Sequence, residues 1–164
     1  MVFFRIKKIK GKEYAYIVAN EWGKNGSRQK VKGYLGRVHR FDLKHNVEFF
    51  QFVKSESIDK YINENNENKM INDLIEWELF KFGVNKGKFA LDFSNKKIKK
   101  NIVIAINDGF LCNLTLKNLL EFKPEDEQND GYRLARAFVE AGIKVPQEIF
   151  VGVFNKLYKT ISKW

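Results

Sequence analysis

The first 41 residues alternate apolar and polar side chains in three stretches that two tight turns separate. Residues 3–9 and 13–22 are joined by a Lys-Gly-Lys turn at 10–12, and a Gly-Lys-Asn-Gly turn at 23–26 leads into residues 27–38. Successive side chains of a strand point to opposite faces, and glycine and asparagine tolerate the positive φ of hairpin turns. This pattern predicts a three-stranded antiparallel meander at the start of the chain.

The alternation also sorts the side chains of the meander onto two faces. One face is predicted to be apolar and to contain Phe4, Ile6, Ala15, Ile17, Ala19, Val31 and Leu35. The opposite face is predicted to gather positive charges and aromatic rings: Arg5, Lys7, Tyr14, Tyr16, Arg28, Lys30, Lys32 and Tyr34.

Positive charge is concentrated in the same part of the chain. The first 45 residues hold twelve lysines and arginines against three acidic residues, whereas the remainder carries eighteen basic and seventeen acidic residues. Lysine and arginine neutralise phosphates, and exposed tyrosines stack on unpaired bases. Residues 1–45 therefore predict a nucleic-acid-binding module, although a solvated face with its tyrosines turned inward has the same composition. The predicted contacts are Arg5, Lys7, Lys8, Lys10, Tyr14, Tyr16, Arg28, Lys30, Lys32, Tyr34, Arg37 and Arg40.

Residues 46–164 differ in character and predict a second, mixed domain. Ser55 or Ser57 is a suitable cap for a short helix that ends near residue 63. Helical spacing of apolar residues then predicts a helix over 69–82, and Gly83 stands where it would end. Further along we expect strands over 88–93 and 101–106, a turn at 107–109 into a strand over 110–114, a helix over 115–122, an acidic loop over 124–130, and helices over 131–141 and 146–162. The predicted fold class is α+β.

The last two predicted helices meet across Gly142 and share one apolar seam. A helix-turn-helix DNA reader is one interpretation, but the second helix begins with Pro-Gln-Glu at 146–148 and has little positive charge before Lys156. A packed helical hairpin that builds the core or docks a protein partner fits better. The aromatic residues that either extend a partner-facing stripe or lie inside are Phe150, Phe154, Tyr158 and Trp164.

Several classes of protein are disfavoured by the sequence. No apolar run approaches the roughly 20 residues that span a bilayer, and Arg5 interrupts the opening apolar stretch, so we expect a cytoplasmic protein without membrane contact. Cys112, the single cysteine, lies in an apolar stretch that favours a buried thiol. His39 and His45 are placed in a linker, where they predict phosphate contacts or exposure rather than a metal site. No glycine-rich phosphate loop or other cofactor motif is present, so we expect no cofactor.

Three short strings carry a resemblance to a known family. They are IKKIKGKEY at residues 6–14, GSRQKV at 26–31 and YLGRV at 34–38. Together they resemble the N-terminal segment of insertion-sequence transposases of the DDE type, and of small archaeal proteins that share it. The likeness covers about a quarter of the chain. It implies a module that helps to hold DNA ahead of a catalytic domain, and not a catalyst itself.

A transposase catalytic domain would need three spaced carboxylates on a ribonuclease-H-like fold to hold two metal ions. Asp92, on the predicted strand over 88–93, superficially fits the first of these positions. Asp108 and the acidic residues at 125–127 do not make convincing second and third positions, because a turn and a solvated loop already explain them. We therefore expect a non-enzymatic protein.

The sequence thus predicts a nucleic-acid-binding protein with a basic β module over 1–45 and an α+β domain over 46–164. RNA, including structured RNA in a ribonucleoprotein, is favoured over DNA, because the charge is spread over a sheet with aromatic rings and no helix fits a groove. The alternatives are a DNA-binding relative of the transposase segment, and a metal-dependent nuclease centred on Asp92.

Overall fold

The computed structural model describes residues 2–161. The three predicted N-terminal strands are present as β1 (Val2–Ile9), β2 (Lys12–Gly23) and β3 (Gly26–Arg40), and each pairs antiparallel with the next. The turn between β1 and β2 is made by Lys10 and Gly11, both with positive φ, as a two-residue hairpin with right-handed strand twist requires. The predicted meander is therefore confirmed.

The remaining elements include two more strands and the helices. The strands are β4 (Ile102–Ile106) and β5 (Gly109–Leu111). The helices are α1 (Phe49–Val53), α2 (Ile58–Glu64), α3 (Glu67–Lys81), α4 (Asn113–Leu120), α5 (Glu127–Glu140) and α6 (Gln147–Ile161). The α+β class is confirmed.

One sheet runs through both predicted parts of the chain. Its strand order is β1-β2-β3-β4-β5, with β3 and β4 parallel and the other pairs antiparallel. Along β3, Gly26–Arg37 pairs with β2, and Arg37–Arg40 pairs with β4. The boundary predicted at residue 45 follows the end of β3, but the sheet itself crosses it.

The predicted strand over 88–93 is wrong. Residues 86–97 form turns, and Asp92 makes only an isolated bridge with Lys97. Phe89 is almost completely buried and Leu91 packs on the same core, so these two side chains produce an alternating pattern without a strand. Positive φ at Ala90 and Lys96 bends the backbone on both sides of Asp92.

Two predicted boundaries also shift because helices begin early. The strand predicted over 110–114 ends at Leu111, because Cys112 is the N-cap of α4 and its backbone N–H donates to the Thr115 hydroxyl. Helix α5 starts inside the predicted acidic loop, because the Asp126 carboxylate accepts from the Gln128 backbone N–H and caps the helix there.

The larger core lies between the helices and one face of β4 and β5. Helix α3 is its centre and contacts α1, α4 and α6. Its side chains Met70, Leu74 and Ile75 are completely buried. Ile104 and Ile106 of β4 join this core from the sheet.

A second, smaller core lies on the opposite face of the sheet. Ala15, Val38, Val103, Ala105 and Cys112 are buried there, and Phe4, Ile6, Leu35 and Phe110 pack against them. Phe4 belongs to β1 and Phe110 to β5, the two edge strands, yet their ring centroids are 5.5 Å apart. The sheet must therefore curl until its edges approach each other.

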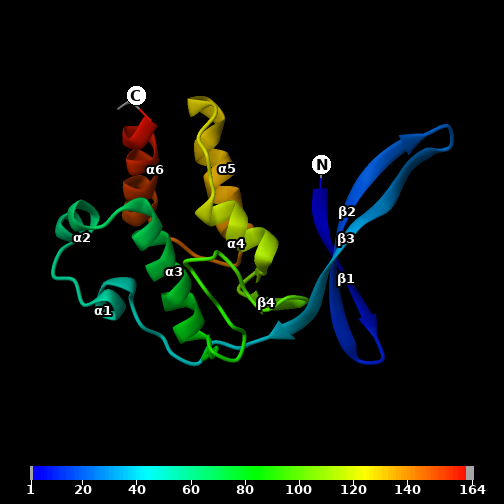
Figure 1. Cartoon of the computed structure of the whole chain (residues 1–164), viewed down its shortest axis with the longest axis horizontal. Coiled ribbons are helices and arrows are strands. Elements are labelled where there is room, and N and C mark those ends of the chain that lie inside the picture. The colour runs from blue at the N-terminus through cyan, green and yellow to red at the C-terminus, as the bar shows by residue number, and fades with distance from the viewer. Residues whose placement is uncertain (1, 162–164) are drawn as a thin grey trace.

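Beyond β1, the hairpin of β2 and β3 continues as a two-stranded ribbon. β1 pairs with β2 only as far as Ala19, and residues 20–32 are all exposed. Figure 1 shows this ribbon reaching away, at the upper right, from the helices on the left. We call residues 20–29 the arm.

Candidate nucleic-acid interface

The face of β1–β3 opposite the second core carries two cross-strand rows of aromatic and basic residues. One row is Lys7, Tyr14 and Arg37, and the other is Arg5, Tyr16 and Tyr34. Residues directly opposite each other on neighbouring strands share a face, so all six side chains project to the same side. We call these six residues the tyrosine face.

The rings of the tyrosine face lie close to one another and to the cations. The Tyr34 centroid is 5.3 Å from that of Tyr16 and 6.5 Å from that of Tyr14. The Lys7 Nζ atom lies 5.0 Å from the Tyr16 centroid. Arg5, the cross-strand partner of Tyr16, donates a hydrogen bond to the Gln29 side chain, 3.2 Å away. The predicted gathering of Arg5, Lys7 and the tyrosines on one face is confirmed.

Tyr34 is the most open ring of the three, with 46% of its surface exposed, whereas Tyr14 and Tyr16 are half-buried. Partial burial, and then its two tyrosine neighbours, raise the pKa of the Tyr34 hydroxyl. The hydroxyl therefore stays protonated at neutral pH and can donate a hydrogen bond to a phosphate or a sugar.

The predicted positions of Val31, Lys32, Lys30 and Arg28 are wrong. The β2–β3 register shifts between Ala15 and Tyr16 and again between Ile17 and Val18. Each shift adds an unmatched residue to β3 and moves the following side chains to the other face. Val31 pairs with Val18 on the side of the tyrosines, while Lys30 pairs with Ala19 and Arg28 with Glu21 on the opposite side.

The surface opposite the tyrosine face carries cations that are partly neutralised. Lys32 Nζ lies 2.5 Å and Lys30 Nζ 3.7 Å from the Glu21 carboxylate. The hydrogen bond from Lys32 lowers the pKa of Glu21, so this carboxyl stays ionised. We call Arg28, Lys30 and Lys32 the back-face cations.

The other predicted cations lie near the base of the hairpin. Arg40 Nε is 2.5 Å from the Glu13 carboxylate, and its hydrogen bond lowers the pKa of Glu13. Lys8 is the cross-strand partner of Glu13, and Lys10 lies in the β1–β2 turn. The carboxylates that pair with the basic residues of the module thus come from the module itself, and the tyrosine face lies apart from them.

The remaining candidate residues are not brought together. Asp92 lies in a loop, where its carboxylate accepts from the Asn95 backbone and side-chain amides, which lower the pKa of Asp92. His39 lies in β3 and not in the predicted linker, and its ring is 5.5 Å from Phe89. His45 stacks on Phe80. Within the described part of the chain, no group of three or more His, Cys, Asp or Glu residues is arranged to hold a metal ion.

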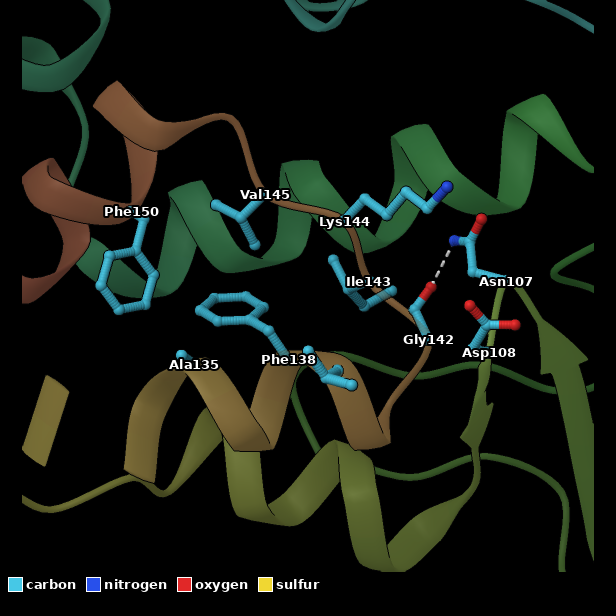
Figure 2. Close-up of a pocket in the computed structure, with 10 residues that line it drawn as sticks. Asn107, Asp108, Ala135, Phe138, Gly142, Ile143, Lys144, Val145 and Phe150 are labelled. Atoms are coloured by element: carbon cyan, nitrogen blue, oxygen red, sulfur yellow. Dashed lines mark hydrogen bonds between the residues drawn. The ribbon is translucent and has the colours of Figure 1, made fainter. Parts of the chain in front are cut away.

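An apolar hollow of about 360 Å³ lies between the C-terminal helices and the β4–β5 turn. Figure 2 shows Phe138, Ile143, Val145 and Phe150 around it, with Lys144 and Asp108 at the rim. For Phe150 and Phe154 the sequence left a partner-facing stripe and an internal position open, and both are partly buried against the larger core. Trp164, for which the same two alternatives were open, lies outside the described residues.

No helix among residues 2–161 is long and apolar enough to cross a membrane. Comparison of the chain with models of protein families, with curated proteins and with solved structures finds no match. The interface must therefore be interpreted from its own geometry.

Proposed function

We propose that this chain is a non-enzymatic nucleic-acid-binding protein that holds single-stranded RNA on the tyrosine face. The observation that carries the proposal is the pair of cross-strand rows, in which three neighbouring tyrosines lie beside three cations. Aromatic rings on a sheet stack on splayed bases, and adjacent lysines and arginines neutralise the phosphates that connect them.

The composition of this face favours an unpaired strand over a duplex. A base inside a duplex is already stacked, whereas a single strand offers both base planes and backbone to the same surface. Base–aromatic stacking contributes about 1–3 kcal/mol per base, which exceeds what one exposed ion pair contributes. The tyrosines therefore add affinity for unpaired bases, and the cations add affinity for phosphates together with its salt dependence.

The test measures binding of a labelled single-stranded RNA of about twelve nucleotides by fluorescence anisotropy over a series of salt concentrations. We expect Tyr34→Ala to weaken binding about tenfold, because it removes one stacking platform, and Tyr34→Phe to retain most of the affinity. Arg5→Ala should reduce the slope of log K against log salt by about 0.7.

Lys117→Ala serves as the control, because Lys117 is an exposed cation on α4 and does not belong to the strands that form the tyrosine face. It should leave both affinity and slope unchanged. Equal losses for Lys117→Ala and Arg5→Ala would mean that net charge alone attracts the RNA, and this would overturn the proposal.

A second candidate is a DNA-binding protein, which the resemblance to the transposase segment implies. The arm favours this candidate, because the major groove of B-form DNA admits a two-stranded β-ribbon, whereas the deep, narrow groove of an RNA helix does not. Direct competition between the two nucleic acids decides between these candidates. Tighter retention of duplex DNA than of single-stranded RNA would favour the DNA-binding candidate.

A further inference from the structure

We propose that the arm binds at a fork, where an RNA duplex opens into two single strands, with Trp22 against the last base pair. One strand then lies on the tyrosine face and the other on the back-face cations. This inference rests on the proposed function, because it assumes that the tyrosine face holds RNA.

The arm has the shape that such a contact needs. It extends beyond the last β1–β2 pair, at Val2 and Ala19, so that only its own two strands pair with each other there. Residues 20–32 are exposed on both faces. A thin ribbon with two open faces can lie between two diverging strands, which a sheet covered by helices cannot do.

The two faces of this ribbon carry groups that are suited to different strands. The register shifts leave Arg28 and Lys30 on the side opposite Tyr16 and Tyr34. A single strand stacked on the tyrosines therefore runs along the wrong side of the ribbon to meet Arg28 or Lys30. The back-face cations are three against one carboxylate, Glu21, and so retain a net positive charge for a second phosphate backbone.

Trp22 lies at the end of the ribbon, next to the turn, and 85% of its surface is exposed. Exposure of an indole ring to water is unfavourable, so its burial stabilises a complex. An exposed base pair at a fork offers a flat apolar surface of matching size. Apolar and aromatic side chains at the tips of nucleic-acid-binding elements stack on or between base steps in this way. Trp22 is thus placed to cover the pair that the fork exposes.

The spacing agrees with one continuous path on the tyrosine face. Tyr16 and Trp22 are six residues apart on β2, which corresponds to roughly 20 Å, or about six nucleotides at the spacing of stacked bases. A strand that leaves the duplex at Trp22 therefore reaches Tyr16 after a short single-stranded stretch.

The experiment compares three RNA ligands: a duplex that ends in two single-stranded tails, one of its strands alone, and the blunt duplex. The last base pair before the tails contains 2-aminopurine, whose fluorescence changes when a ring stacks on that pair. We expect the fork to bind about tenfold more tightly than the single strand, with a change in 2-aminopurine fluorescence. Trp22→Ala should abolish both the preference and the fluorescence change, and Trp22→Phe should preserve them.

Affinity for the single strand alone separates this inference from the proposed function. Trp22→Ala should leave the affinity for the single strand unchanged, because the tyrosine face is intact. Arg28→Ala should weaken binding of the fork and leave binding of the single strand unchanged. Equal binding of fork and single strand, or equal losses for both ligands in Trp22→Ala, would overturn the fork while leaving the RNA-binding face in place. Failure of every RNA to bind the wild-type protein would instead overturn the proposed function.

Discussion

Glu78 and Asp130 are completely buried, and both form hydrogen bonds with distant parts of the chain. Glu78 accepts from the Asn107 side chain and from the Lys144 backbone, and Lys81 lies 3.2 Å away. Asn107 also donates to the Gly142 carbonyl, as Figure 2 shows.

Asp130 accepts from the Glu125 and Asp126 backbones, from Arg133 and from the Tyr158 hydroxyl. These buried carboxylates connect helices to turns, and their charges are satisfied within the fold.

A third buried carboxylate, Asp73, accepts a 2.8 Å hydrogen bond from the Tyr61 hydroxyl. Burial, and then this hydrogen bond, raise the pKa of Tyr61 above its ordinary value of 10.0. A raised pKa means that the fold favours the protonated hydroxyl. Its contribution to the free energy of unfolding is therefore complete below pH 10.0 and is lost as the pH rises above that value.

Tyr61→Phe removes this titration and leaves the ring in place. We expect the wild-type protein to lose about 1 kcal/mol more stability than Tyr61→Phe between about pH 8 and about pH 11, as measured by urea unfolding. Tyr132→Phe is the matched control, because Tyr132 is 72% exposed, and it should lose as much stability as the wild type. An identical fall for Tyr61→Phe and the wild type would contradict the assignment.

At the scale of elements, β3 explains most of the difference between the expected and observed basic surface. It contains Gly33 and Gly36, and each register shift leaves the β3 residue next to one of these glycines unmatched. An isolated glycine within a strand pattern is a signal for a bulge, so the sequence held a clue to the shift. The glycines do not show in which direction the register shifts or by how many residues, because only the pairing with β2 determines which residues are left unmatched.

Gly36 also has a packing role that Gly33 lacks. A Cβ on Gly36 would lie 2.3 Å from the backbone carbon of Asn101, and its φ of +148° is unfavourable for other residues, whereas a Cβ on Gly33 meets no atom within 4 Å. We expect Gly36→Ala to lower the free energy of unfolding by about 3 kcal/mol, because β3 and β4 must move apart, and Gly33→Ala to change it by less than about 1 kcal/mol. Urea denaturation of both variants tests this; similar midpoints would show that β3 adjusts to the extra methyl group.

For the whole molecule, the curled sheet joins the N-terminal strands to the strands that pack on the helices. β3 pairs with both β2 and β4, and the small core joins Phe4 of β1 to Phe110 of β5. The basic module predicted over residues 1–45 is therefore fixed to the helices by pairing and by packing. The tyrosine face is thus attached to the part of the sheet that packs on the helices, while the arm extends from it, as Figure 1 shows.

Hydrogen exchange tests this connection. We expect backbone amides of β2 near Ala15 and of α3 near Leu74 to report opening free energies within about 1 kcal/mol of each other, because both belong to one unfolding unit. Phe110→Ala should lower both values together by about 3 kcal/mol. A loss confined to β1 and β2, with α3 unaffected, would show that the two parts open independently.

The sequence by itself determined the α+β class, the three N-terminal strands, α3 and the position of the tyrosines beside Arg5 and Lys7, because these depend on local periodicity and turn residues. Tertiary structure decided where Arg28 and Lys30 face, that Phe89 and Leu91 belong to turns, and that Phe4 meets Phe110. Each of these depends on contacts between residues distant in the chain, and an alternating pattern carries no information about which partner a strand will find.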